Sequence, residues 1–442
     1  MARKKGAAEA VKAQAIRLCV TDSSSFEAPS DEADKWLRRL ARGVRAGDFV
    51  VALSDDGQVE DEEIVYCERD GTWRAGRYIG TVVFEGHTLV IEPRFGRPRF
   101  LEWLSEIQSI VLAKMPGVLE RHENFIAALL AVIWGRAFVE AARHGLPALR
   151  HETRTAGTML RGALSVRESI RLRAAGSPKV VSVRRERTLD HAVSNVIVAA
   201  YATLRRELKG APLQWLPERA AELLPHLVAA AGAHPPVPSK AELARIRYTP
   251  ITAGFARFAE LSRQIATRRG MTTSATDSGE THGVLLDVAE LWELHVLHVL
   301  RTACRPLVVR HGTRDESGHA RLLTSEIDGT RMGTLMPDAL LCEGEEVRAI
   351  VDAKYKRIHG KPQRDDLYQL AAYLARFAGR DGNAVGALVY PEDPERPERA
   401  DVERRSPWRV DAGKRFWFVA LPLERGAAQA RCAQLVAQMV GA

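Results

Sequence analysis

The sequence predicts an α+β protein of several domains, and three observations lead to this fold class. The chain has 442 residues, about three times the length of a common domain. Residues 1–100 alternate apolar and polar side chains between glycines, whereas residues 101–275 place apolar side chains at helical spacing. Residues 280–442 mix both patterns. We therefore predict a β-rich N-terminal domain with a frayed tail over residues 1–15, a helical middle region, and a C-terminal mixed sheet flanked by helices.

Short apolar runs between turn residues predict the strands of the N-terminal domain. Gly71, Gly76, Gly86 and Gly96 divide this part of the chain into segments of strand length. A helical pattern precedes these glycines at residues 36–42. The predicted strands are residues 49–53, 63–67, 78–84 and 87–95.

The rest of the chain first reads as helical and then as mixed. A Thr/Ser/Gly-rich segment at residues 271–283 has no apolar period, so we interpret it as a linker before the C-terminal domain. The predicted helices are residues 100–112, 124–142, 189–208, 241–269, 284–304, 365–377 and 427–440. The predicted strands are residues 162–166, 321–325, 339–342, 347–352, 384–390 and 415–421.

Composition and charge exclude several classes of protein. Hydrophobic residues make up 46% of the chain and charged residues 27%, which excludes a collagen, a mucin and a largely disordered chain. No apolar run reaches the ~18 residues of a membrane span, and the first residues lack the apolar core of a signal peptide. The five cysteines are scattered, without the spacing of a zinc site. We predict a cytoplasmic protein, without a membrane partner, whose net charge of +8 permits an anionic partner.

Two aspartates and a lysine form the most informative pattern. Asp338 opens one predicted strand, and Asp352 ends the next, apolar strand. Lys354 projects from the same face as Asp352 if the strand continues. A hairpin would join the carboxylates into an oxygen site for Mg²⁺ (or Mn²⁺), with the backbone carbonyl of Ala353 as a further ligand. With Lys354 activating water, the pattern predicts metal-assisted phosphodiester hydrolysis, and the alternative is a surface ion pair.

The same residues resemble the motif of the PD-(D/E)xK nuclease superfamily, with Pro337-Asp338 and Asp352-Ala353-Lys354 in its places. The next helical segment resembles the Q-x-x-x-Y helix of one branch of that superfamily, and the segment around Trp292 resembles a helix that supplies one more acid. The alternative for these two segments is that their polar and aromatic side chains only pack or face solvent, with no role in catalysis. The catalytic residues that the resemblance implies are Asp338, Asp352, Lys354, Glu293, Gln369 and Tyr373.

Further segments, in the same order along the chain, resemble the McrC family. They are residues 78–83 and 89–95, Leu160-Arg-Gly-Ala-Leu-Ser-Val, Thr188-Leu-Asp-His-Ala-Val-Ser-Asn and the Asp338–Lys354 block. McrC proteins are nuclease subunits of modification-dependent restriction systems, which defend against phage. The resemblance implies an McrB-like AAA+ GTPase ring as partner, whose GTP hydrolysis the N-terminal domain stimulates, and modified double-stranded DNA as substrate. The family often has Lys where this chain has Arg94, and these two side chains are not equivalent.

Basic residues cluster between residues 161 and 190, where eight basic side chains face three acidic ones. Such a cluster predicts contacts with DNA phosphates, and its alternative is a solvated face. The arginines that we predict to contact DNA are Arg161, Arg167, Arg171, Arg173, Arg184, Arg185 and Arg187.

These observations predict a Mg²⁺-dependent DNA endonuclease subunit. The sequence contains no P-loop pattern, so GTP would act only through the partner. Two alternatives remain open. One is a non-catalytic activator and DNA clamp of an AAA+ ring, and the other is a stand-alone repair-type nuclease of the same superfamily.

Overall fold

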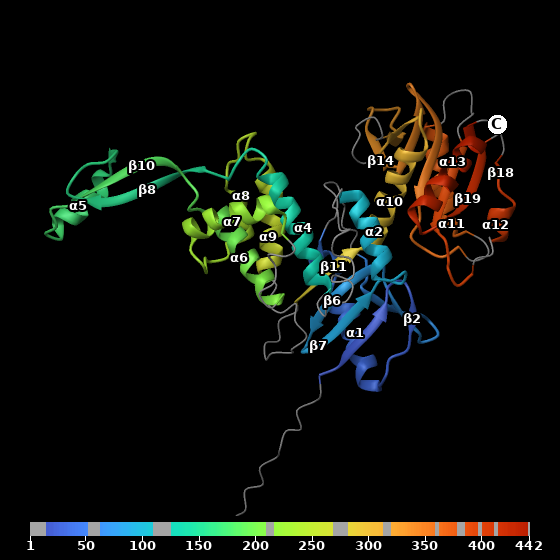
Figure 1. Ribbon diagram of the computed structural model, residues 1–442, viewed down its shortest axis with the longest axis horizontal. Helices are drawn as coiled ribbons and strands as arrows, with labels where there is room; N and C mark the ends of the chain where they lie inside the picture. Colours follow the sequence, from blue (N-terminus) through green and yellow to red (C-terminus); the bar gives the residue numbers. More distant parts are fainter. Residues whose placement is uncertain are drawn as a thin grey trace, which may run out of the picture. The chain divides into compact units, whose positions relative to one another are not determined.

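The computed structural model describes residues 15–51, 62–108, 125–208, 216–267, 282–312, 320–358, 362–377, 385–396, 400–410 and 414–440 (Figure 1). The fold is mixed α/β, with several sheets. It divides into two compact units. One unit joins Met1–Pro116 to Ala275–Ala442, and the other is Gly117–Ser274. The N-terminal tail and most of the predicted linker at residues 271–283 lie outside the described residues.

The N-terminal part of the first unit contains a five-stranded sheet. Its order is β1 (Arg17–Thr21), β7 (His87–Glu92), β6 (Tyr78–Phe84), β11 (His282–Asp287) and β3 (Val50–Val51). Helix α1 (Asp31–Gly43) covers this sheet, because Trp36, Leu37 and Leu40 are fully buried against the strands. The helix begins at Ser30, whose hydroxyl accepts a hydrogen bond from the Ala33 amide at 3.2 Å. A smaller sheet lies beside it, made of β2 (Ser25–Phe26), β5 (Trp73–Ala75) and β4 (Val65–Cys67).

Strand β11 joins this N-terminal sheet although it follows the middle region in sequence. It pairs antiparallel with β6, and Leu285 lies opposite Gly80. Gly80 has a φ of +143°, and a Cβ atom there would lie 1.9 Å from the carbonyl oxygen of Val284. Only glycine lets the two strands approach this closely. The first unit is therefore built from both ends of the chain.

The C-terminal part of the first unit is a six-stranded mixed sheet. Its order is β12 (Val308–Arg310), β15 (Ala339–Glu343), β16 (Glu346–Ala353), β17 (Val385–Pro391), β19 (Arg415–Leu421) and β18 (Trp408–Arg409). Strands β16, β17 and β19 are parallel, which explains their nearly continuous apolar sequences. A separate hairpin, β13 (Ala320–Thr324) with β14 (Arg331–Leu335), precedes β15.

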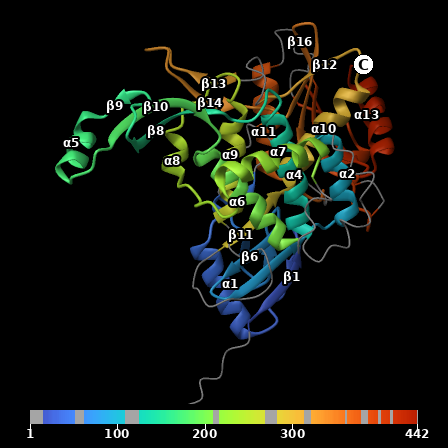
Figure 2. The ribbon, with the colours of Figure 1, turned by 60° about the vertical axis from the view of Figure 1, so that its left-hand side comes forward.

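Helices cover both faces of this sheet (Figure 2). Helices α11 (Arg364–Phe377) and α12 (Asp401–Arg404) pack on one face, where Leu370 contacts a cluster that includes Ile350 and Leu388. Helices α10 (Val288–Ala303) and α13 (Arg425–Val440) pack against each other and against β16. Helix α2 (Arg97–Gln108) packs on α10.

The middle unit is helical only in part. Its helices are α4 (Phe125–Ala141), α6 (Ala192–Glu207), α7 (Glu218–Ala231), α8 (Lys240–Ala244) and α9 (Gly254–Thr267). Strands β8 (Leu149–Gly157) and β10 (Val180–Thr188) form a long antiparallel ribbon with the short β9 (Ala163–Leu164), and α5 (Val166–Ala174) lies at its end (Figure 1). We call residues 149–188 the arm. The prediction of a mainly helical middle region did not include β8 and β10, in which polar and charged residues outnumber apolar ones.

Among the described residues, no helix is both long and apolar enough to cross a membrane.

Candidate active site

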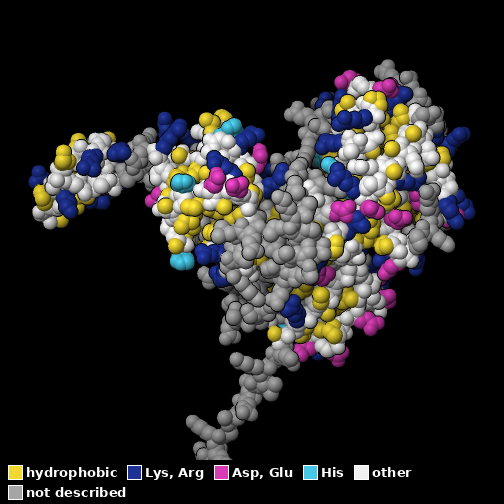
Figure 3. All heavy atoms as spheres, viewed as in Figure 1, with side chains coloured by type: hydrophobic (Ala, Val, Ile, Leu, Met, Phe, Trp, Pro, Cys, Tyr) yellow, Lys and Arg dark blue, Asp and Glu magenta, His cyan; other side chains and the backbone are white. Residues whose placement is uncertain are grey.

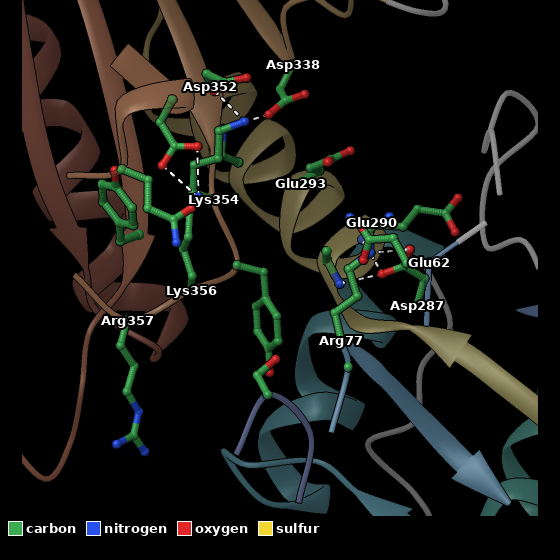
Figure 4. Close-up of a pocket in the computed structure, with 18 of the residues that line it drawn as sticks. Glu62, Arg77, Asp287, Glu290, Glu293, Asp338, Asp352, Lys354, Lys356 and Arg357 are labelled. Atoms are coloured by element: carbon green, nitrogen blue, oxygen red, sulfur yellow. Dashed lines mark hydrogen bonds and ion pairs between the residues drawn. The ribbon is translucent and has the colours of Figure 1, made fainter. Parts of the chain in front are cut away.

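The hairpin of β15 and β16 brings the two predicted aspartates together. Ala339 pairs with Val351, so Asp338, just before β15, lies beside the end of β16. The Oδ2 atom of Asp338 accepts a hydrogen bond from the Ala353 amide at 2.6 Å. Asp352, with a side chain only 1% exposed, lies with its Oδ2 atom 2.8 Å from Nζ of Lys354. Figure 4 shows these residues in one pocket.

Glu293 reaches the same pocket from helix α10 (Figure 4). The helix begins at Asp287, whose Oδ1 atom accepts hydrogen bonds from the amides of Ala289 (2.8 Å) and Glu290 (3.3 Å). Arg77 of the N-terminal sheet forms an ion pair with Asp287, with Nε 3.1 Å from Oδ2. The cap by Asp287 and the ion pair between Asp287 and Arg77 therefore fix the first turn of α10. Glu293 lies about one and a half turns further along the helix than Asp287.

Gln369 and Tyr373 lie one turn apart on α11 and connect the lysine to the loop before Asp338. Oε1 of Gln369 accepts a hydrogen bond from Nζ of Lys354 at 2.8 Å. The amide nitrogen of Gln369 donates to the Tyr373 hydroxyl at 2.8 Å, and this hydroxyl donates to the Met336 carbonyl at 3.2 Å. The chain of hydrogen bonds runs from the lysine to the backbone two residues before Asp338.

We call the cavity that these residues line the carboxylate pocket. Its volume is about 1260 Å³, and it is lined by residues from both ends of the chain. Several ionisable residues of the carboxylate pocket were not among the predicted site residues. The Asp287-x-x-Glu290 pattern signals a helix start and could have pointed to Asp287. Ionisable lining residues outside the predicted set include Glu62, Arg77, Asp287, Glu290, Lys356 and Asp366.

Glu293, Asp338 and Asp352 have raised pKa values. Burial is the first cause for Glu293, followed by the charges of Asp287 and Asp352, and together they raise its pKa from 4.5 to about 8. Burial, and then the charges of Glu293 and Asp352, raise the pKa of Asp338 well above its usual value. Burial also raises the pKa of Asp352, although Lys354 opposes this change. The single ammonium of Lys354 does not neutralise the three carboxyl groups of Glu293, Asp338 and Asp352, so their pKa values stay raised.

This donor set fits a hard divalent cation. Mg²⁺ typically binds one or two protein carboxylates and keeps several waters, and an ion's positive charge would relieve the repulsion among the acids. Asp338, Asp352 and the carbonyl of Ala353 are the residues that would hold it. Among the residues that the structure describes, no three Asp, Glu, His or Cys side chains form a ready-made cage. The remaining ligands would therefore be waters and a phosphate oxygen.

The predicted DNA-contact arginines lie on the arm, in a different unit from the carboxylate pocket. Arg167, Arg171 and Arg173 belong to α5, and Arg184 and Arg187 belong to β10. The side chain of Arg185 lies outside the described residues. Figure 3 shows basic and hydrophobic side chains together on the arm. Its exposed apolar side chains are Met159, Leu160, Leu164, Val166 and Ile170.

Two histidines have defined structural roles. Helix α6 begins at His191, whose Nδ1 atom accepts a hydrogen bond from the Ser194 amide at 3.4 Å. His295 of α10 is fully buried and stacks on Trp103, with ring centroids 5.1 Å apart.

Comparisons with known proteins agree in family and in fold. A family model described as the McrBC 5-methylcytosine restriction system component matches residues 73–391. No curated protein sequence matches the chain. A solved structure described as a refined half-complex from a tetradecameric assembly of Thermococcus gammatolerans McrB AAA+ hexamers with bound McrC aligns with a TM-score of 0.57 and 15% identity, over 96% of this chain and 100% of that chain. The cryo-EM structure of the Thermococcus gammatolerans McrBC complex aligns at a TM-score of 0.37 and 16% identity, over 65% of this chain and 88% of that chain.

The structural alignment supports the fold, and the family model covers well over half of the sequence. The chain therefore belongs to the McrBC 5-methylcytosine restriction system component family.

Proposed function

We propose that this chain is the nuclease subunit of a modification-dependent restriction complex that defends against phage. It cleaves double-stranded DNA with Mg²⁺ and binds and stimulates an AAA+ GTPase ring like the one in the similar solved structure. The observation that carries the proposal is the convergence of Glu293, Asp338, Asp352 and Lys354 in the carboxylate pocket. The four side chains come from α10, from the loop before β15 and from the end of β16.

In this mechanism the chain's own residues orient water and stabilise charge. A bound Mg²⁺ ion would supply Lewis-acid stabilisation of negative charge on the scissile phosphate. The ammonium of Lys354 orients a water for attack and stabilises the phosphorane-like charge that develops. Gln369 keeps this ammonium directed at the pocket through the 2.8 Å hydrogen bond. Tyr373 fixes the loop before Asp338, because its hydroxyl donates to the Met336 carbonyl.

The side chain of Glu293 is protonated near neutral pH in the metal-free protein, because its pKa is about 8. It can therefore hold a proton for the leaving group or, once ionised, join the ligand set. The seven arm arginines stay a prediction as DNA contacts. A surface that combines arginine with exposed apolar side chains is also typical of protein interfaces, so the GTPase ring is a second possible partner of the arm.

We expect the purified chain to cleave DNA poorly by itself. The sequence contains no P-loop, so GTP must act through the partner. Cleavage of plasmid DNA containing 5-methylcytosine should require the chain, an McrB-type GTPase, GTP and Mg²⁺ together. Efficient Mg²⁺-dependent cleavage by the chain without the GTPase would favour the stand-alone nuclease instead. Stimulation of the GTPase without any cleavage would favour the non-catalytic activator.

A second prediction concerns the stability of the metal-free protein. The folded pKa of Glu293, about 8, exceeds its usual value of 4.5, so the folded state keeps a proton that the unfolded state has already lost. The free energy of unfolding should therefore fall as the pH rises from about 4.5 towards about 8. Glu293→Gln cannot ionise and should have a shallower decline, so in EDTA at pH 8 it should melt at a higher temperature than the wild type. Thermal denaturation from pH 5 to pH 8.5 measures this, and an unchanged slope would contradict it.

A further inference from the structure

Arg94 lies in the turn after β7 and is buried against the residue that follows the catalytic lysine. Its guanidinium carbon lies 4.0 Å from the ring centroid of Tyr355 and 4.7 Å from that of Phe95. Asp22, at the end of β1, accepts a hydrogen bond from the Arg94 amide at 2.5 Å. The Nε atom of Arg94 lies 3.9 Å from Oδ2 of the same aspartate. The N-terminal sheet therefore presents a buried ion pair to the segment that begins at Lys354.

Stability alone does not account for this ion pair. The side chain of Arg94 is 2% exposed and that of Asp22 is 0% exposed, so both charges are removed from water. The attraction between the two charges at 3.9 Å offsets part of that cost, but among the described residues Nε and Nη2 of Arg94 make no hydrogen bond. Apolar side chains of similar volume usually stabilise such a position at least as well. A buried cation here indicates a role beyond packing.

The segment after β16 is held on two sides. Nζ of Lys354 donates to Gln369 of α11, and Nζ of Lys356 donates to Oδ1 of Asp366 at 2.8 Å. Tyr355, between the two lysines, contacts the N-terminal sheet instead. Successive residues thus bind opposite neighbours, as expected of extended backbone. Removing the Tyr355 contact would take away the attachment of this segment to Arg94, and Lys354 would then be held by Gln369, Asp352 and the Val389 carbonyl.

Aromatic contacts extend from Arg94 to the other element of the site. The Phe95 ring packs edge-on against Tyr355 and against Trp103 of α2, at 6.0 Å between centroids in both cases. Trp103 in turn lies 5.2 Å from Trp292, which directly precedes Glu293 on α10. Phe95 therefore contacts the segment that carries Lys354, and Trp103 links it to α10, which carries Glu293.

We propose that Arg94, paired with Asp22, is a positioning residue for the nuclease site. By fixing Tyr355 it sets the place of Lys354 relative to Glu293, and it makes the geometry of the site depend on the N-terminal domain. This inference rests on the proposed nuclease function for its effect on cleavage, but the contact itself can be tested without cleavage. Displacements of about 1 Å at a reacting group can cost about 100-fold in rate.

The test uses the full-length double variant Arg94→Met/Asp22→Asn, which removes both charges and nearly conserves volume. The Lys354 amide donates to the Val389 carbonyl at 2.8 Å, so its hydrogen exchange reports on the end of β16. We expect exchange in residues 352–356 to be at least about tenfold faster than in the wild type, with β6 still protected. In the reconstituted cleavage assay, kcat should fall about 10- to 100-fold while the KM for DNA stays within about twofold. Arg94→Lys should recover part of kcat, because its ammonium still pairs with Asp22.

Arg97→Gln is the matched control. Arg97 is the first residue of α2, three positions after Arg94, and pairs with Glu92 at 2.6 Å, so exchange in residues 352–356 and cleavage should stay at the wild-type level. Wild-type exchange in residues 352–356 of the double variant would overturn the proposal, as would faster exchange throughout the first unit. Faster exchange confined to residues 352–356, combined with no cleavage by the wild type itself, would support the positioning contact and refute the proposed function.

Discussion

Lys354→Met is expected to reduce DNA cleavage by the reconstituted complex by about 100- to 1000-fold, the loss typical of removing one stabilising donor from a transition state. Nζ of Lys354 lies 2.8 Å from Oδ2 of Asp352, and the lysine side chain is only 18% exposed. Its pKa is raised because, although burial disfavours the charge, Asp352 and Asp338 favour it. It is therefore charged at neutral pH, and in the proposed mechanism it acts as a charge stabiliser and as an orienting donor. Initial rates of plasmid cleavage at saturating Mg²⁺ measure the effect.

Arg431→Met provides the matched control for this substitution. Arg431 of α13 is 16% exposed and lies 2.9 Å from Glu403, which is 2% exposed, so the pair resembles Lys354–Asp352 in distance and burial. It does not line the carboxylate pocket. Its loss should lower the melting temperature but leave the cleavage rate of the folded protein unchanged. Equal losses of cleavage in both variants would show that Lys354 acts through stability and not through chemistry.

Gly312→Ala should be nearly as damaging, although glycine carries no functional group. A Cβ atom at residue 312 would lie 1.9 Å from the carbonyl oxygen and 2.8 Å from the nitrogen of Pro337. The backbone at Pro337 must move, and Asp338 moves with it. We expect a loss of about 1–3 kcal/mol or more in the free energy of unfolding, and a fall in cleavage of about 100-fold.

Denaturant titration and cleavage rates test this expectation. Gly426→Ala is the control, because a Cβ atom at this position on α13 meets nothing within 4 Å. It should be neutral or slightly stabilising, since alanine in a helix is favoured over glycine. Wild-type cleavage by folded Gly312→Ala protein would show that the place of Asp338 is less constrained than the backbone contact implies.

Contacts between residues that are near in sequence could be predicted better than contacts between residues that are far apart in sequence. The hairpin of β15 and β16 follows from two apolar runs with a glycine turn, and the spacing of Gln369 and Tyr373 follows from the helical period. The Arg77–Asp287 ion pair joins residues 210 positions apart, so no local pattern could predict it. The same is true of the contact between Arg94 and Tyr355.

The arm was missed for a different physical reason. Strand β8 reads Leu-Arg-His-Glu-Thr-Arg-Thr-Ala-Gly and has no apolar face, because a two-stranded ribbon standing away from a core buries little on either side. A period-two apolar signal depends on one buried face. The basic cluster that we placed in a helical region therefore lies partly on a ribbon. Strand β11 was obscured by the Thr/Ser/Gly-rich segment before it, and its antiparallel partner β6 lies about 200 residues earlier in sequence.

In the proposed function, DNA is cut in the carboxylate pocket. The most direct measurement compares wild type, Asp352→Asn and Glu403→Gln in cleavage of 5-methylcytosine-containing plasmid with the GTPase partner, GTP and Mg²⁺. Glu403 is a buried acid of the same sheet domain, outside the pocket. We expect cleavage by the wild type and by Glu403→Gln, and a loss of at least about 1000-fold for Asp352→Asn, since a metal ligand supplies several kcal/mol at the transition state. Cleavage by folded Asp352→Asn at the wild-type rate would contradict it.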